Sequence, residues 1–250
     1  MRALAIVHQA DAGPGIFGRA IRAAGCGLDS WLPPTQPDPP DPDGFDAVLT
    51  FGGAMHPDQE DAHPWLRTEK ALLARLLDRG TPLMAVCLGS ELLAEAAGGR
   101  PRRAREPEIG WGEVEVADEA AGDRVIGPLA PRFTAFQWHS YETPLPPGAA
   151  ALATSPVCLQ AYRVGDAAWG IQFHAEVKPA DARRWIDDYR SDPDAVAIGI
   201  DPERLRAETQ ERIGAWNRLG FELCERFLDA VSRASRTRPR SRRRRGTPTR

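Results

Sequence analysis

The chain has 250 residues, of which 42% are hydrophobic and 27% are charged, and its formal net charge is −3. These proportions are typical of a globular protein with a sizeable core, and they favour a single main domain over residues 1–232. The apolar run at 3–7 is shorter than a signal peptide requires, and no stretch approaches the roughly 20 apolar residues of a membrane span. We therefore expect a cytoplasmic protein without a membrane segment.

The four cysteines are far apart in the sequence, at positions 26, 87, 158 and 224. They form no CxxC pair and no spacing typical of a zinc site, which fits a reducing compartment. The sequence therefore predicts no metal site and no cofactor, and each thiol has to be judged by its surroundings.

Residues 233–250 contain nine arginines and no acidic residue, so the rest of the chain is acidic. A run rich in Arg, Ser, Thr and Pro without an apolar period cannot bury enough surface to fold, which predicts a disordered tail. Contact with nucleic acid or another acidic partner is one interpretation of this tail. A solvated extension, or one attracted to the acidic body of its own chain, is the other.

The first hundred residues alternate between strand-like and helix-like patterns. Expected strands are 3–8, 28–32, 45–51 and 82–87, and expected helices are 15–24, 64–79 and 90–98. The prolines in 33–44 exclude regular structure there. Because the strands are almost continuously apolar, we predict a parallel sheet covered by helices on both faces, with its chemistry at the carboxyl ends of the strands.

The second half predicts shorter strands followed by helices. Expected strands are 112–116, 133–138, 157–164 and 168–174, and expected helices are 179–189 and about 200–231. The whole pattern indicates an α/β fold.

Gly13, Gly15 and Gly18 form a GxGxxG pattern that follows a strand and begins a helix, as in a dinucleotide-binding turn. Five residues, HQADA, separate the apolar run at 3–7 from the first glycine, Pro14 stiffens the loop, and no convincing acid ends a second strand about 20 residues later. We therefore regard this motif as weak.

The stretch TPLMAVCLGSELLAEAAG, residues 81–98, reads as strand, sharp turn and helix around Cys87. A nucleophile elbow has this form, and the small residues Ala85 and Gly89 suit its tight turn. The positive end of the following helix would favour a thiolate at Cys87. The stretch alone does not decide between a reactive cysteine and a buried structural one.

A histidine near a cysteine can act as base and proton shuttle because its pKa lies near neutrality. His174 ends the apolar strand WGIQFH and would therefore reach the same sheet edge as Cys87. Glu176 could accept a hydrogen bond from the second ring nitrogen, which would complete a Cys-His-Glu triad. His139 ends another strand, but it has an aromatic neighbour and no carboxylate placed to orient it, so we interpret it as a wall or loop anchor.

Gly52 and Gly53 end a strand whose carboxyl end should face the elbow. Glycines at this point let backbone N–H groups approach an anion closely, as an oxyanion hole requires.

Four segments together carry a family resemblance: FGGAM at 51–55, PLMAVCLGSE at 82–91, WHS at 138–140 and GIQFHAE at 170–176. In this order they resemble the motifs of class I, triad-type glutamine amidotransferases, specifically free-standing proteins similar to the glutaminase domain of GMP synthase. The resemblance covers roughly residues 1–190. It implies a flavodoxin-like three-layer α/β sandwich with a mostly parallel central sheet, and hydrolysis of the glutamine side-chain amide.

By position, the resemblance implies the roles of individual residues. Cys87 would be the nucleophile, His174 the acid and base, and Glu176 the orienting group. The oxyanion would be held by the amides of Gly53 and Leu88. Four residues would bind substrate: Gly52, Glu91, Ser140 and Tyr141.

Two departures from the family pattern concern the elbow and the substrate. Ala85 stands where the family usually has glycine, a change of one methyl group. Glu91 stands where the family usually has a glutamine that helps to bind substrate. A carboxylate there would repel an incoming carboxylate and would suit a cationic or amine-bearing group.

Three functions therefore remain open. The protein releases ammonia from glutamine for a separate synthase partner, or it hydrolyses another γ-glutamyl amide or amine. The third is a catalytically silent binding protein of the same fold that uses the basic tail as its contact.

Overall fold

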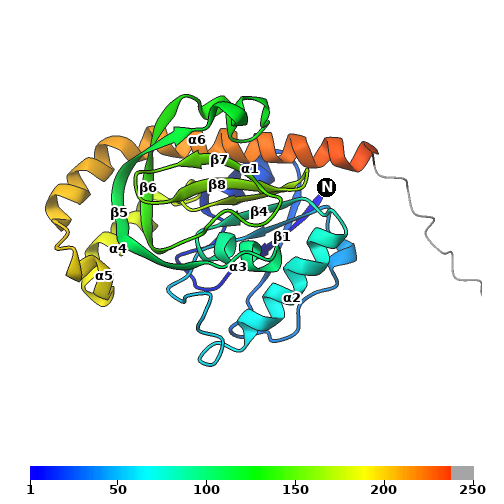
Figure 1. Ribbon diagram of the computed structural model, residues 1–250, viewed down its shortest axis with the longest axis horizontal. Coiled ribbons are helices and arrows are strands. Elements are labelled where there is room, and N and C mark those ends of the chain that lie inside the picture. The colour runs from blue at the N-terminus through cyan, green and yellow to red at the C-terminus, as the bar shows by residue number, and fades with distance from the viewer. Residues whose placement is uncertain (238–250) are drawn as a thin grey trace, which may run out of the picture.

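The computed structural model describes residues 1–237, and within them nine strands form one sheet between two layers of helices (Figure 1). The strands are β1 (Arg2–Ile6), β2 (Gly27–Trp31), β3 (Ala47–Thr50), β4 (Leu83–Val86), β5 (Arg102–Val116), β6 (Arg132–Glu142), β7 (Ala150–Thr154), β8 (Leu159–Val164) and β9 (Ala168–Ile171). The α-helices are α1 (Gly15–Ala23), α2 (Trp65–Asp78), α3 (Leu88–Ala96), α4 (Pro179–Asp187), α5 (Pro193–Ala197) and α6 (Pro202–Thr237). Short 3₁₀ helices span Pro42–Gly44, Asp118–Gly122, Gly127–Leu129 and Tyr189–Ser191.

Five strands form the parallel half of the sheet, in the order β2-β1-β3-β4-β9. With β9 as the fifth parallel strand, this is the 2-1-3-4-5 order of flavodoxin-like folds, in which ligands bind outside the carboxyl ends of the strands. The predicted three-layer α/β sandwich is confirmed.

The other four strands continue the sheet in antiparallel pairing, in the order β8-β7-β5-β6. Two predictions were wrong here. Strand β7 was not expected, and β5 begins at Arg102 rather than at Gly112. The early part of β5 is charged and mostly exposed, because β7 pairs only with its last two residues. A charged edge segment of this kind has no apolar pattern from which a strand could be predicted.

Hydrophobic cores fill both faces of the sheet. Phe17 of α1 and Phe227 of α6 belong to the core on one face, whereas Leu73 of α2 and Leu92 of α3 belong to the core on the other. These four side chains are fully buried. Burial of such a side chain contributes about 1.5–3 kcal/mol, so both helical layers stabilise the sheet that carries the site.

Helix α6 is longer than predicted. It runs without interruption from Pro202 to Thr237, so residues 233–237, which we assigned to a disordered tail, are helical. No proline follows Pro202 until Pro239, and a helix already formed extends readily through residues such as Arg and Ala. The rest of the predicted tail, 238–250, lies outside the described residues.

No helix within residues 1–237 is long and apolar enough to cross a membrane.

Candidate active site

The carboxyl ends of four parallel strands bring the predicted site residues together. Gly52 follows β3, Cys87 follows β4, and His174 lies three residues beyond the end of β9. The loop after β1 contributes His8 to the same edge. Sequence-distant segments therefore meet where this sheet topology places ligands.

Cys87 lies in a strained turn between β4 and α3. It is the only non-glycine residue with a positive φ among residues 1–237, with φ 52° and ψ −116°. Its amide donates to the Ile171 carbonyl of β9 over 2.9 Å. A Cβ on Gly89 would lie 2.6 Å from the Thr50 carbonyl oxygen, so only glycine fits beside the turn. Such strain, of order 1–3 kcal/mol, often occurs at functional sites, and the predicted strand-turn-helix is present.

Both backbone groups of His174 form hydrogen bonds, one to a strand and one to a helix. Its amide donates to the Phe136 carbonyl of β6 over 2.9 Å, and its carbonyl accepts from Trp216 Nε1 of α6 over 2.8 Å. The expected strand therefore ends earlier, at Ile171, because His174 leaves the ladder for these partners. The edge of the Trp185 ring, from α4, packs on the imidazole with centroids 4.9 Å apart.

Glu176 lies against the second ring nitrogen of the imidazole. Its Oε1 lies 2.8 Å from His174 Nδ1, and both side chains are at most 3% exposed. The Glu176 carbonyl accepts from the Ile16 amide at the start of α1 over 2.8 Å. A Cβ on Gly15 would lie 2.0 Å from that carbonyl oxygen. The GxGxxG turn thus packs against the segment that carries Glu176.

The thiol and the imidazole influence each other's charge. Burial raises the pKa of Cys87, and the neighbouring His174 opposes that effect. For His174, burial alone would lower the pKa, but the Glu176 carboxylate and Cys87 raise it well above its ordinary value. The sequence led us to expect a thiol of lowered pKa, and desolvation reverses that direction. A thiolate at Cys87 therefore depends on the imidazolium beside it.

The two glycines that follow β3 pack closely on the elbow and its surroundings. A Cβ on Gly52 would lie 3.0 Å from His174 Cε1 and 3.8 Å from Cys87 Sγ. A Cβ on Gly53 would lie 3.2 Å from the Leu88 side chain. Any side chain at 52 would therefore crowd the thiol and the imidazole.

A pocket of about 400 Å³ opens over Cys87. Among the predicted residues it is lined by Gly53, Cys87, Leu88, Glu91, Ser140, Tyr141 and His174. Gly52 and Glu176 lie behind this lining. The structure thus brings all the predicted site residues into one region.

Glu91 is buried at the pocket, 3% exposed, and its Oε1 accepts from Gln172 Nε2 over 3.1 Å. Burial raises the pKa of Glu91 to about 7, with Glu95 and Asp58 adding to the rise. Near neutral pH this carboxyl is therefore partly protonated. In the neutral form it offers an O–H donor beside a carbonyl acceptor, whereas a glutamine amide offers two N–H donors beside a carbonyl acceptor.

Tyr141 joins two walls of the pocket. Its hydroxyl donates to Asp58 Oδ2 over 2.9 Å, and its ring stacks on His56 with centroids 4.3 Å apart. The loop after β3 and the end of β6 are thereby linked beside Ser140.

A buried network that the sequence did not reveal lies behind Gly52. His8 Nδ1 donates to the Gly52 carbonyl over 3.1 Å, and His8 Nε2 lies 2.8 Å from Glu69 Oε2. Thr50 Oγ1 donates to Glu69 Oε1 over 2.6 Å. Both side chains of the His8–Glu69 pair are fully buried. Glu69 lies on the apolar side of α2, and a charged residue at such a position is the one signal that could have indicated a buried partner.

Further aromatic and acidic side chains line the pocket, and of these only Trp138 lies in a sequence motif singled out above, WHS at 138–140. They are Trp138, Trp185, Asp188, Asp192 and Asp194. Trp138 Nε1 donates to Asp192 Oδ2 over 2.9 Å, and Arg103 pairs with Asp194.

A model of the family "Glutamine amidotransferase class-I" matches residues 18–188, which include Cys87, His174 and Glu176. The chain belongs to the class I glutamine amidotransferase family.

Individual relatives of this chain agree with that family assignment. The chain is 29% identical over 142 residues to the glutamine amidotransferase-like protein YfeJ of Salmonella typhimurium, covering 55% of this chain and 59% of YfeJ. It is 38% identical over 100 residues to a subunit of glutamine-hydrolysing GMP synthase from Sulfolobus acidocaldarius, covering 39% of this chain and 52% of the Sulfolobus protein. The matches thus span only about half to three-fifths of these relatives.

A solved structure extends the similarity over nearly the whole chain. A glutamine amidotransferase of Thermotoga maritima superposes with a TM-score of 0.82 at 28% identity, covering 92% of this chain and 98% of that one. The flavodoxin-like arrangement is therefore shared with a family member.

Proposed function

We propose that this glutamine amidotransferase hydrolyses the side-chain amide of glutamine through a thioester on Cys87. The observation that carries the proposal is the buried His174–Glu176 pair, 2.8 Å apart, beside a cysteine in a strained elbow. The family membership and the open pocket over Cys87 support it.

In the first half of the reaction the Cys87 thiolate attacks the carboxamide carbon. The backbone N–H groups of Gly53 and Leu88 hold the oxyanion that forms, and His174 gives its proton to the departing nitrogen, so that the C–N bond breaks and ammonia leaves. Glu176 stabilises the imidazolium before that transfer and keeps the ring oriented.

In the second half, water replaces ammonia. His174 takes a proton from the water, the hydroxyl attacks the thioester carbon, and the C–S bond breaks to give glutamate and the Cys87 thiolate beside a protonated His174, as at the start of the cycle. Positioned acid-base catalysis contributes about 10² to 10⁴ in rate and an oxyanion donor about 10² to 10³, so both devices are needed.

The ammonia acceptor that we propose is a separate synthase. The Sulfolobus relative is named as a subunit of a glutamine-hydrolysing GMP synthase. That name supports an arrangement in which glutamine hydrolysis and the use of ammonia lie on separate chains. Ammonia release should then rise when the correct partner is added.

A second substrate class is favoured by the charge of the pocket. Five acids line it, Asp11, Glu91, Asp188, Asp192 and Asp194, against two arginines, Arg103 and Arg184. The excess of acids would attract a γ-glutamyl amide whose leaving group is a cationic amine. The same thioester would form at Cys87, and an amine would leave in place of ammonia.

Ammonia release from glutamine tests the proposal. Cys87→Ser should reduce the rate at least about a thousandfold, because a serine hydroxyl is a much weaker nucleophile than a thiolate. Cys26→Ser, which changes a thiol outside the pocket, is the matched control and should keep the wild-type rate. Equal rates in Cys87→Ser and wild type would refute the role of Cys87.

A panel of γ-glutamyl amines, followed by amine release, separates the two substrate classes. If neither glutamine nor any γ-glutamyl amine is hydrolysed, with or without candidate synthases, the catalytically silent binding protein becomes the better account.

A further inference from the structure

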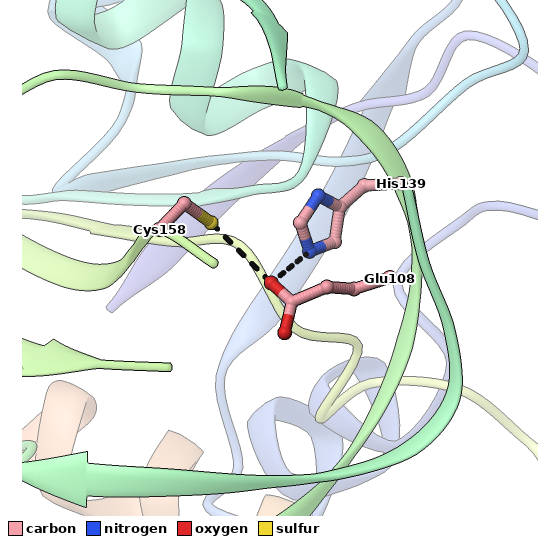
Figure 2. Close-up of side chains that lie close together, drawn as sticks. All are labelled: Glu108, His139 and Cys158. Carbon is pink, nitrogen blue, oxygen red and sulfur yellow. Dashed lines mark hydrogen bonds and ion pairs between the residues drawn. The ribbon is translucent and has the colours of Figure 1, made fainter. Parts of the chain in front are cut away.

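Glu108, His139 and Cys158 converge beside the pocket, although they are far apart in the sequence (Figure 2). Glu108 on β5 and His139 on β6 stand directly opposite each other in the antiparallel ladder, and Cys158 immediately precedes β8. Their three potential ligand atoms all lie within 4.8 Å of one another. This arrangement corrects our expectation that no carboxylate is placed beside the His139 imidazole, because the register of β5 and β6 brings Glu108 there.

The separations of these atoms fit a tetrahedral metal ion. His139 Nε2 lies 3.3 Å and Cys158 Sγ 3.4 Å from Glu108 Oε2. With bonds of about 2.0–2.1 Å to nitrogen and oxygen and about 2.3 Å to sulfur, ligands of tetrahedral zinc lie about 3.3 Å apart for N and O and about 3.5 Å apart for S and O. The two observed separations match these values.

The imidazole of His139 is held in an orientation that suits a metal ligand. His139 Nδ1 donates to the Tyr141 carbonyl over 2.9 Å, which leaves the Nε2 lone pair directed into the cluster. Nε2 is buried and makes no hydrogen bond within the described structure, although it lies near Glu108. In metal sites, the histidine nitrogen that does not bind the metal commonly donates a hydrogen bond to a backbone carbonyl, which fixes the ring orientation.

The two anionic ligands also have supporting partners. Gln160 Nε2 lies 2.7 Å from Glu108 Oε2 and 3.4 Å from Cys158 Sγ, and Ser155 Oγ donates to Glu108 Oε2 over 2.9 Å. Donors of this kind stabilise a carboxylate and a thiolate that share a cation. A buried Glu-His pair without a metal is the competing account, and it leaves the Nε2 geometry unexplained.

We propose that Glu108, His139 and Cys158 bind one divalent transition-metal ion, for which Zn²⁺ has the best-fitting ligand chemistry. One thiolate, one imidazole and one carboxylate suit this ion, and a water would occupy the fourth position. The ion joins β5, β6 and the segment before β8, and it holds the strand end that carries Ser140 and Tyr141. The proposal does not depend on glutamine being the substrate.

Cobalt binding tests the site in the full-length chain. The background is Cys87→Ser, so that the thiol of the pocket cannot contribute a signal. After removal of metals with a chelator, this variant should bind one equivalent of Co²⁺, with visible bands of a tetrahedral ion and a thiolate charge-transfer band in the near ultraviolet. Adding Cys158→Ser should abolish the charge-transfer band, whereas adding Cys26→Ser should leave it unchanged. Absence of stoichiometric binding, or a charge-transfer band that survives Cys158→Ser, would overturn the proposal.

A milder variant covers the case in which Cys158→Ser does not fold. Glu108→Gln in the same background keeps the shape of the side chain and removes its charge. Competition against a chromophoric chelator should show Zn²⁺ affinity at least about tenfold weaker than in the Cys87→Ser parent, and Zn²⁺ should raise the Tm of the parent more than that of the variant. Equal affinities and equal Tm shifts would contradict the carboxylate ligand.

Discussion

We propose that Glu91 controls how this site responds to the charge of a substrate, because it is the pocket residue at which the chain departs from the family pattern. Its pKa is raised to about 7 by burial. The carboxyl therefore changes charge within the range in which such an enzyme is assayed. Protonated, it resembles the usual glutamine, whereas ionised it repels a substrate carboxylate and attracts a cation.

Glu91→Gln should expose this behaviour. The ratio of wild-type to variant kcat/KM for glutamine should fall as pH rises through about 7, by about fivefold, equivalent to about 1 kcal/mol of like-charge repulsion. Taking the ratio removes the part of the Cys87 and His174 titration that is common to both proteins. For a γ-glutamyl amine with a cationic leaving group, the same ratio should rise. If the ratio is independent of pH for both substrates, Glu91 has no role in substrate recognition.

Local sequence patterns were enough to predict that Cys87, His174 and Glu176 lie together. Each residue lies at or just beyond the end of a strand that a run of apolar residues predicts. The His8–Glu69 pair and the cluster of Glu108, His139 and Cys158 could not be found in this way. Their members are distant in sequence, and only strand register and helix packing bring them together.

The elbow between β4 and α3 is the element on which the proposed chemistry depends. Gly89 packs so closely on the Thr50 carbonyl that an added Cβ would lie 2.6 Å from that oxygen. The neighbouring backbone of β3 cannot move far, because β3 is paired on both sides.

Gly89→Ala should therefore displace the elbow, with a loss of about 1–3 kcal/mol of stability and slower alkylation of Cys87. Gly214→Ala is the matched control, because Gly214 lies within α6 and a Cβ there would meet nothing within 4 Å. It should stabilise the protein by about 0.5–1 kcal/mol and leave alkylation unchanged. Urea unfolding and the alkylation rate measure both effects, and Gly89→Ala behaving like Gly214→Ala would contradict the tight packing.

The helices and strands with a strong hydrophobic period were predicted correctly. The strands whose conformation depends on pairing with neighbouring strands were not. Helix α2 and strand β4 were expected almost to the residue. The charged start of β5 and the short, alanine-rich β7 carry no distinctive period, and their conformation comes from antiparallel neighbours. The short α5 was not expected either, although Asp192 caps it by accepting from the Asp194 amide.

At the scale of the whole molecule, three buried groups share one direction of pKa shift. Burial raises the pKa of Glu91. For His8 and His174, burial acts to lower the pKa, but the carboxylates of Glu69 and Glu176 outweigh it and raise the pKa in each case. A group whose pKa is raised on folding stabilises the fold below its unfolded pKa and loses that contribution as pH rises through its folded pKa.

The free energy of unfolding should therefore fall as pH increases from about 6 to above the raised pKa values of the histidines. Glu91 loses its own contribution between its ordinary value of 4.5 and about 7, a change of about 3 kcal/mol. Urea unfolding at a series of pH values measures the total, and Glu91→Gln should flatten the curve over the lower part of the range. Stability that rises across this range would contradict the buried charges described above.

The central claim is that Cys87 carries the glutamyl group during turnover, and trapping that intermediate tests it most directly. Wild-type protein mixed with glutamine, quenched in acid within the first turnovers and digested should yield a peptide containing Cys87 with a γ-glutamyl thioester by mass spectrometry. Every γ-glutamyl substrate should give the same adduct, and Cys87→Ser should give none. Ammonia release by wild-type protein without this adduct, or with the glutamyl group on another residue, would contradict the account.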